Sequence, residues 1–274
     1  MIHPKPLVYF KPKPLRLPRR KIVTIVMGFK AQAGIVLGAD SQETISDISK
    51  TNCCKTLNVA DRMVLTGSGD SDYLDAVFYE IATDFTINNR ATPEEVQTDI
   101  QQILIKFYKL HVLPFMRFES DLGINLLIAA HIGGQNYLWK TSRNSISPVS
   151  EYASAGAGEY MARILFDRFY PGMHSISITT AKYLLAYLLY YVKKFVPGCG
   201  GTSSIYCFHA DGHIEGMGRD VDAAEKLFEE LDTLLGLQML FVTGAGEHRE
   251  AVAKVLDRLR EQLLGLHDDL RKLS

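Results

Sequence analysis

Two apolar runs rich in β-branched residues, at 23–28 and 35–39, flank a short connection at 30–34 that ends in Gly34. Runs of this length around a glycine-containing connection are typical of a β-hairpin with buried strands. Antiparallel pairing about a turn near residue 32 brings Thr24, which starts the first strand, close to Asp40, which ends the second. The hairpin therefore predicts a hydroxyl group beside a carboxylate at one end of a buried sheet.

In the rest of the chain, the expected strands follow one another in groups, and so do the expected helices, instead of alternating one by one. Helix starts are indicated at residues 70–72 and at Thr92-Pro93, where Thr92 is a capping residue and Pro93 fits the first turn. Such grouping favours a layered α+β domain over an alternating β-α-β fold. Strands are expected at 54–59, 63–66, 124–132, 136–141, near 149, 203–209 and 214–217. Helices are expected at 73–85, in a segment that begins at 92, and at 159–169, 179–195, 220–235 and 247–270. Residues 240–246 are expected to join the last two helices.

Residues 1–23 differ in composition from the rest. They hold seven Lys or Arg residues, five of the ten prolines and no acidic residue. Proline at this density favours extended backbone with nothing to bury, so we expect a basic arm or a removable pro-segment. Residues 24–274 are expected to form the domain, with 220–274 as its helical C-terminal part. A solvated cover for the sheets is favoured there over a partner-binding coiled coil.

Composition excludes several classes of protein. The chain has 274 residues, 47% of them apolar and 22% charged, which is typical of globular domains. Beyond residue 23 the net charge is −8, which disfavours nucleic-acid binding. No window of 18 uncharged apolar residues is present, so no membrane span is expected. The four cysteines lack the pattern of a disulfide framework, and a reducing, cytoplasmic location is expected.

Motifs for cofactors and metals are weak. Gly-x-Gly occurs at 67–69, 156–158 and 244–246, but without the third glycine of a dinucleotide-binding motif, and no Walker A sequence is present. The histidines lack metal-ligand spacing. The acidic residues Asp70, Asp72 and Asp75 are better explained by helix capping and first-turn charge than by a cation site. We therefore expect neither a cofactor nor a metal.

Further spacings extend the pattern of the first hairpin. Asp40 follows Thr24 by sixteen residues, Lys55 follows Asp40 by fifteen, and Gly69 follows Lys55 by fourteen. With the Gly-Ile-Val-Leu-Gly-Ala-Asp-Ser sequence at 34–41, this pattern resembles the proteasome family of N-terminal-nucleophile hydrolases, which includes 20S β-type subunits and bacterial HslV-like peptidases. The Lys spacing is one residue shorter than in that family. Glycine-rich stretches at 155–160 and 198–201 also look like family landmarks.

The resemblance implies a four-layer αββα sandwich and a threonine peptidase. In this family the nucleophile, here Thr24, is exposed by removal of the preceding segment, and its own α-amine, with an ordinary pKa of about 8, is the base. Lys55 would supply positive charge, Asp40 would orient Lys55, and the Gly69 N–H would stabilise the oxyanion, an effect of about 3–4 kcal/mol. The resemblance also implies peptide or unfolded-protein substrates, a homo-oligomeric ring and an ATP-dependent unfoldase as a possible partner.

The chain departs from the family pattern at several supporting positions. Val23 stands where self-processing members usually have glycine, and Ala157 stands where a supporting serine is expected. The Asp-x-x-Ser-Gly element aligns with residues 196–200, so that Val196 replaces the aspartate and Cys199 the serine. These departures keep open a non-catalytic proteasome-like subunit or interaction protein. An N-terminal-nucleophile amidase acting on a small molecule is a third possibility.

Overall fold

The computed structural model describes residues 24–45, 49–84, 92–114, 123–173, 175–218 and 220–244, and single residues between 254 and 268. The predictions made for residues 1–23, and for most of a helix at 247–270, lie outside these ranges. Within them, two five-stranded sheets form the centre of the molecule.

The first sheet contains the predicted hairpin. Its strands are β1 (Ile25–Ala31), β2 (Gly34–Asp40), β10 (Tyr152–Gly156), β11 (Ser203–His209) and β12 (Ile214–Gly216), in the spatial order β10-β1-β2-β11-β12. All neighbouring strands are antiparallel. Val26 pairs with Ala39, so the turn falls at residues 32–33, as the sequence predicts. The pairing places the start of β1 beside the end of β2.

The second sheet follows chain order. It comprises β5 (Thr56–Val59), β6 (Met63–Ser68), β7 (Asn125–Ile132), β8 (Gln135–Ser142) and β9 (Ser145–Pro148), again antiparallel throughout. Buried side chains from both sheets, among them Val26, Leu37, Val64, Leu127 and Phe208, form one continuous apolar layer. The two sheets therefore stack face to face through a shared core.

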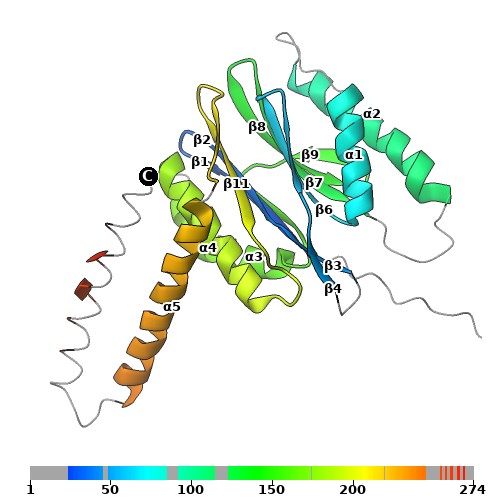
Figure 1. The fold of residues 1–274 in the computed structure, drawn as a ribbon. Helices are drawn as coiled ribbons and strands as arrows, with labels where there is room; N and C mark the ends of the chain where they lie inside the picture. The colour runs from blue at the N-terminus through cyan, green and yellow to red at the C-terminus, as the bar shows by residue number, and fades with distance from the viewer. Residues whose placement is uncertain are drawn as a thin grey trace, which may run out of the picture.

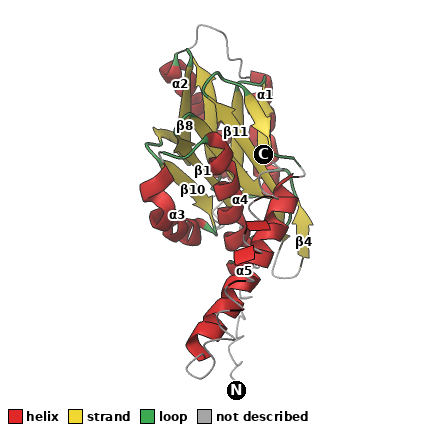
Figure 2. Ribbon diagram, turned by 90° about the vertical axis from the view of Figure 1, so that its left-hand side faces the viewer, coloured by secondary structure: helices red, strands yellow, loops and turns green. Residues whose placement is uncertain are grey.

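Helices cover the outer face of each sheet, as Figures 1 and 2 show. Helices α3 (Glu159–Met173), α4 (Ile178–Phe195) and the first turns of α5 (Asp220–Gly244) pack on the first sheet. Helices α1 (Ser71–Asp84) and α2 (Pro93–Phe107), followed by the π-helical turn η1 (Tyr108–Val112), pack on the second. The result is the predicted four-layer αββα sandwich.

Local sequence accounts for where the helices on the second sheet begin. Thr92 caps α2 by accepting the Glu95 N–H at 3.2 Å, and the Glu95 carboxylate accepts the Thr92 N–H at 2.8 Å. Asp70 precedes α1 and accepts the Asp72 N–H at 3.1 Å through its side chain. These bonds satisfy N–H groups that a helix start leaves unpaired.

Three parts of the fold differ from the sequence-based expectations. The single strand expected near 149 is two strands, β9 and β10, which belong to different sheets. A short hairpin of β3 (Gln42–Ile45) and β4 (Ser49–Asn52) follows β2, where no strands were predicted. Helix α5 continues to Gly244, so the predicted connection at 240–246 was placed too early. The Leu-Gln-Met-Leu sequence at 237–240 has high helix propensity and carries the helix on past Gly236. The far part of α5 extends away from the sandwich in both ribbon views (Figures 1 and 2).

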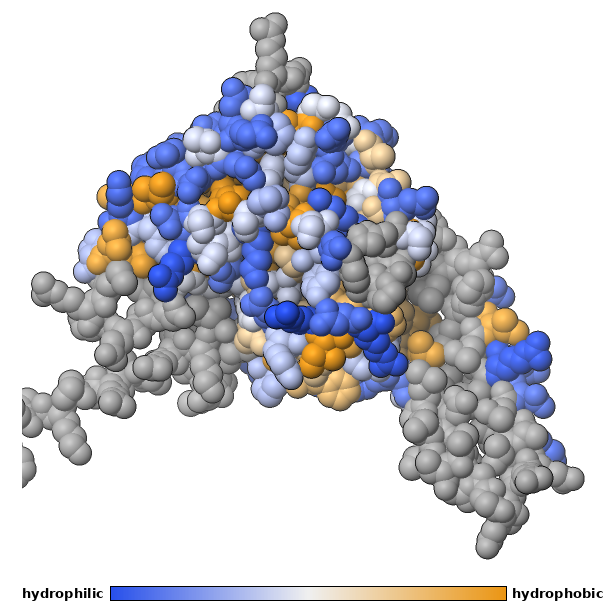
Figure 3. Space-filling view, turned by 180° about the vertical axis from the view of Figure 1, so that it is seen from behind, coloured by the Kyte–Doolittle hydropathy of each residue, from blue (hydrophilic) through white to orange (hydrophobic). Residues whose placement is uncertain are grey.

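The surface of the sandwich is mixed in polarity. On the face in Figure 3, hydrophilic residues cover most of the described surface, and apolar residues form small separate patches among them. Within the described ranges, no helix combines the length and apolar character needed to cross a bilayer.

Candidate active site

The two sheets bring Thr24, Asp40 and Lys55 together at one end of the sandwich. Thr24 directly precedes β1, and Asp40 is the last residue of β2. The Ile25 N–H donates to Asp40 Oδ1 at 3.1 Å, which fixes the carboxylate at the start of β1. Lys55 directly precedes β5, and its carbonyl accepts the Gly67 N–H of β6 at 2.9 Å. Each sheet thus holds one side of the group.

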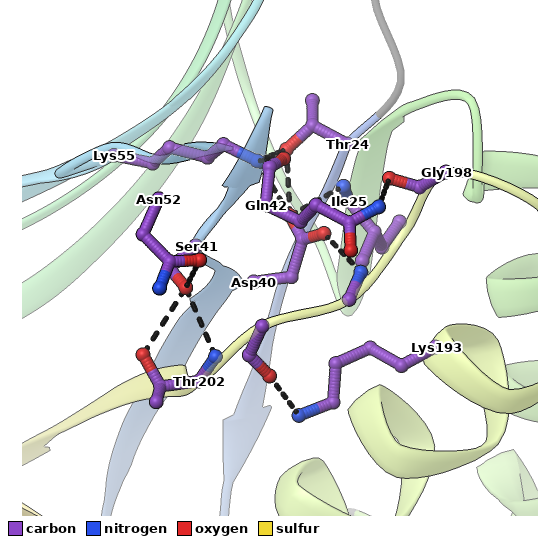
Figure 4. Close-up of polar contacts among 12 residues, drawn as sticks. Thr24, Ile25, Asp40, Ser41, Gln42, Asn52, Lys55, Lys193, Gly198 and Thr202 are labelled. Carbon is purple, nitrogen blue, oxygen red and sulfur yellow. Dashed lines mark hydrogen bonds and ion pairs between the residues drawn. The ribbon is translucent and has the colours of Figure 1, made fainter. Parts of the chain in front are cut away.

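The three side chains are in direct contact (Figure 4). Thr24 Oγ1 donates to Asp40 Oδ1 at 2.7 Å, and Lys55 Nζ donates to the same oxygen at 2.8 Å. Lys55 Nζ also donates to Thr24 Oγ1 and to the Gln42 carbonyl. These three acceptors match the three N–H donors of an ammonium group. The Thr24 hydroxyl is therefore held between a cation and an anion.

Burial makes this arrangement strong. Thr24 is 2% exposed, Asp40 1% and Lys55 4%. Charge–charge and charge–dipole interactions are stronger in a site that excludes water than at the surface. An isolated charge at such a position would be costly, and the Lys55–Asp40 ion pair compensates both charges. A negative charge developing on Thr24 Oγ1 would be stabilised directly by Lys55.

The turn after α4 closes the site behind Asp40. The Gly200 N–H donates to the second carboxylate oxygen, Asp40 Oδ2, at 2.8 Å. Gln42 holds the same turn: its side-chain amide donates to the Gly198 carbonyl at 2.7 Å, and its N–H donates to the Gly200 carbonyl at 3.0 Å. Both oxygens of Asp40 are therefore hydrogen-bonded, one toward Thr24 and one toward the turn.

Gly69, the fourth residue predicted for the site, lies just beyond the end of β6. It is two residues after Gly67, which binds the Lys55 carbonyl, and directly before the Asp70 cap of α1. Its φ of +147° lies where side chains are disfavoured, and an added Cβ would lie 2.8 Å from Ile124 Cγ2. The bonds that join Thr24, Asp40 and Lys55 in the described region do not include Gly69, so its role as an oxyanion donor stays a prediction.

The substituted supporting positions lie next to the same group. Gly158 donates its N–H to the Thr24 carbonyl at 3.3 Å, and the preceding Ala157 is exposed and brings no hydroxyl. Cys199 is buried between Gly198 and Gly200. Burial first, and the Asp40 carboxylate second, raise the pKa of the Cys199 thiol to about 12, against the opposing effects of Lys55 and a Gly158 backbone hydrogen bond. Cys199 therefore adds a neutral thiol to this side of the site.

Two residues that contribute to the site were not predicted from the sequence. Gln42 supplies an acceptor for Lys55 through its backbone carbonyl, a contact that residue type does not indicate. Gly200 binds Asp40 across 160 positions of sequence, and the glycine-rich stretch at 198–201 was the only signal of it. Among the described residues, no group of three or more His, Cys, Asp or Glu side chains is arranged to hold a metal ion.

Comparison with known proteins agrees with the fold described above. The model of the proteasome subunit family matches residues 23–194. No curated protein sequence shows significant similarity to the chain. Two solved structures are similar in fold at 12% identity. Anbu (ancestral β-subunit) from Yersinia bercovieri has a TM-score of 0.63 and covers 80% of this chain and 97% of its own.

The second is the Anbu (Gly-1) mutant from Hyphomicrobium sp. strain MC1, with a TM-score of 0.64, covering 80% of this chain and 99% of its own. At this identity the likeness is one of fold. The family model spans well over half of the chain, from the residue before Thr24 into the last turn of α4. The chain belongs to the proteasome subunit family.

Proposed function

We propose that the chain is a proteasome-like threonine peptidase whose nucleophile is Thr24, exposed by removal of residues 1–23. The observation that carries this proposal is the direct contact of the Thr24 hydroxyl with Lys55 and Asp40 at the start of β1. A threonine hydroxyl is a weak nucleophile without such activation. Membership of the proteasome family adds support, because the matched range begins at residue 23 and includes all three residues.

The reaction proposed for the site is hydrolysis of a peptide bond in two steps. Thr24 Oγ1 attacks the carbonyl carbon while its proton passes to the free α-amine of the same residue. The C–N bond then breaks, the departing amine takes the proton, and a water molecule hydrolyses the resulting ester. Lys55 stabilises the developing charge on Oγ1, and the Gly69 N–H is proposed to bind the carbonyl oxygen.

The α-amine is the part of this mechanism that the intact chain lacks. As long as Val23 precedes Thr24, the Thr24 nitrogen is an amide and has no basic lone pair. Activity therefore depends on cleavage of the Val23–Thr24 bond.

Peptides or unfolded proteins are the proposed substrates. A homo-oligomeric ring is the proposed assembly, an ATP-dependent unfoldase is a proposed partner, and the cytoplasm is the proposed location.

A non-catalytic subunit with the same fold is the second candidate. Three observations favour it: Val23 before the nucleophile, the exposed Ala157, and the neutral Cys199 beside Asp40. Each removes a feature expected to help free or orient the amine. The contact of Thr24 with Lys55 and Asp40 would then serve only to stabilise the end of the sandwich.

A comparison of two forms of the protein separates these functions. One form begins at Thr24, prepared by cleaving a removable leader, and the other retains Val23 and the residues before it. We expect the first form to hydrolyse fluorogenic peptides and the second to be inactive, because only the first has the α-amine. Equal inactivity of both, with the fold intact by circular dichroism, would favour the non-catalytic subunit. Hydrolysis of small amides but not of peptides would favour an amidase.

A further inference from the structure

A partly buried ion pair joins α4 to α5 close to the candidate active site. Lys193 Nζ, in the last turn of α4, contacts both carboxylate oxygens of Glu225, on α5, at 2.6 Å each. The side chains are 10% and 16% exposed. Charged groups at this depth need partners for their remaining hydrogen-bonding capacity. Both groups find these partners in the segment that follows α4.

The pair is bonded to the turn behind Asp40. Lys193 Nζ donates to the Gly201 carbonyl at 3.0 Å, and the Ser203 hydroxyl donates to Glu225 Oε1 at 2.7 Å. Gly200 lies between these two contacts and the Gly198 carbonyl, which accepts a hydrogen bond from the Gln42 side chain. The Gly200 N–H donates to Asp40 Oδ2. The turn is thus fixed on one side by β3 and on the other by the ion pair.

The turn needs such external contacts because of its sequence. Gly198 has a φ of +93° and Gly201 a φ of +72°, conformations that glycine adopts easily but also leaves easily. Three glycines in four residues give the backbone little stiffness of its own. The position of the Gly200 N–H therefore depends on what holds the carbonyls around it.

Of the two residues of the ion pair, Lys193 lies at the end of the part of the chain that the family model matches, and Glu225 lies outside it. That match ends at residue 194, before the turn and before α5. Within the turn region, Val196 and Cys199 occupy the positions where the resemblance implies a supporting aspartate and serine. The chain thus lacks those side chains and has instead a contact from α5.

We propose that Glu225 and Lys193 are positioning residues of the peptidase site, acting on Asp40 through the turn between α4 and β11. This inference rests on the proposed function. The chain of contacts runs from Glu225 to Lys193, to the Gly201 carbonyl, and from the neighbouring Gly200 N–H to Asp40, which orients Lys55 and Thr24. In this arrangement α5 supports the nucleophile as well as covering the sheet.

The test compares Glu225→Gln with Asp232→Asn in the form that begins at Thr24. Asp232 is the matched control, because it also joins the same two helices: it accepts Lys194 Nζ at 2.6 Å and the Tyr191 hydroxyl at 2.5 Å, away from the turn. For Glu225→Gln we expect kcat for peptide hydrolysis to fall about tenfold or more, with KM within about twofold, since the turn lies behind the nucleophile. Asp232→Asn is expected to leave both constants within about twofold.

A second readout does not depend on activity. The Gly200 amide, bonded to Asp40, is expected to exchange with solvent deuterium at least about tenfold faster in Glu225→Gln than in the wild type or in Asp232→Asn. If Glu225→Gln does not fold, the double variant Lys193→Met/Glu225→Met replaces the pair by apolar side chains of similar volume. Such replacements often preserve the fold, and the same changes in kcat and exchange are expected.

The outcomes are distinct. Unchanged kcat and unchanged exchange at Gly200 in the folded variants would overturn the positioning role. Equal losses in Glu225→Gln and Asp232→Asn would also overturn it, because they would assign the effect to docking of α5. If the wild-type form that begins at Thr24 is inactive, the proposed function fails, and the exchange of Gly200 alone decides whether the ion pair holds the turn.

Discussion

Replacing Thr24 by alanine is expected to reduce peptide hydrolysis to the uncatalysed background, a loss of at least about 10⁴-fold in kcat. The variant keeps the α-amine, the Lys55–Asp40 ion pair and the backbone of β1, but has no oxygen to attack the carbonyl. The free energy of unfolding should fall by about 2 kcal/mol, because two hydrogen bonds are lost, one from Thr24 Oγ1 to Asp40 and one from Lys55 Nζ to Thr24 Oγ1. The measurement is peptide hydrolysis by the form that begins at residue 24, together with urea unfolding.

The serine variant is the matched control for this experiment. Thr24→Ser keeps the hydroxyl and removes only a methyl group, so it should keep measurable hydrolysis. Activity of Thr24→Ala equal to that of the wild type would show that another group is the nucleophile. That result would refute the assignment of Thr24 without affecting the fold.

Replacing Lys55 by methionine is expected to remove both activity and stability. Activity should fall by at least about 10³-fold, because no positive charge remains beside Thr24 Oγ1. The free energy of unfolding should fall by about 3–5 kcal/mol, because Asp40, 1% exposed, would lose the cation that compensates its charge. Kinetic assays and urea unfolding on the same preparation measure the two effects.

Lys50 provides the control for Lys55, because it is a nearby lysine with a different environment. It is exposed on the short strand β4, so Lys50→Met should leave activity unchanged and stability within about 0.5 kcal/mol. Loss of activity in Lys50→Met with retention in Lys55→Met would mean that the wrong lysine was assigned. If neither variant loses activity, the result contradicts the proposed role of positive charge at the site.

The parts of the site that could be predicted are those set by local patterns. Residues 24–40 form one hairpin, and the two apolar runs together with the position of the turn are enough to place Thr24 near Asp40. The cap at Thr92 is likewise a short-range signal, fully contained in four residues. Both follow from interactions between near neighbours in sequence.

The parts that could not be predicted depend on contacts between distant segments. The bond from Gly200 to Asp40 joins residues 160 positions apart, and no residue type signals a backbone N–H as a ligand. The β3–β4 hairpin has polar strands of four residues each, too short and too polar to give a periodic pattern. The Lys193–Glu225 pair depends on the packing of α5 on α4, which the charge pattern of either helix does not reveal.

Intact mass spectrometry of the protein, carrying a C-terminal tag and treated with a peptide vinyl sulfone, tests the central claim most directly. An activated hydroxyl adds to the vinyl carbon, its proton passes to the neighbouring carbon, and the resulting ether is stable enough to be mapped. The account predicts a chain whose first residue is Thr24, carrying one peptide adduct on that residue. A chain that retains Val23 and the residues before it, with no adduct, would contradict the account and favour the non-catalytic subunit.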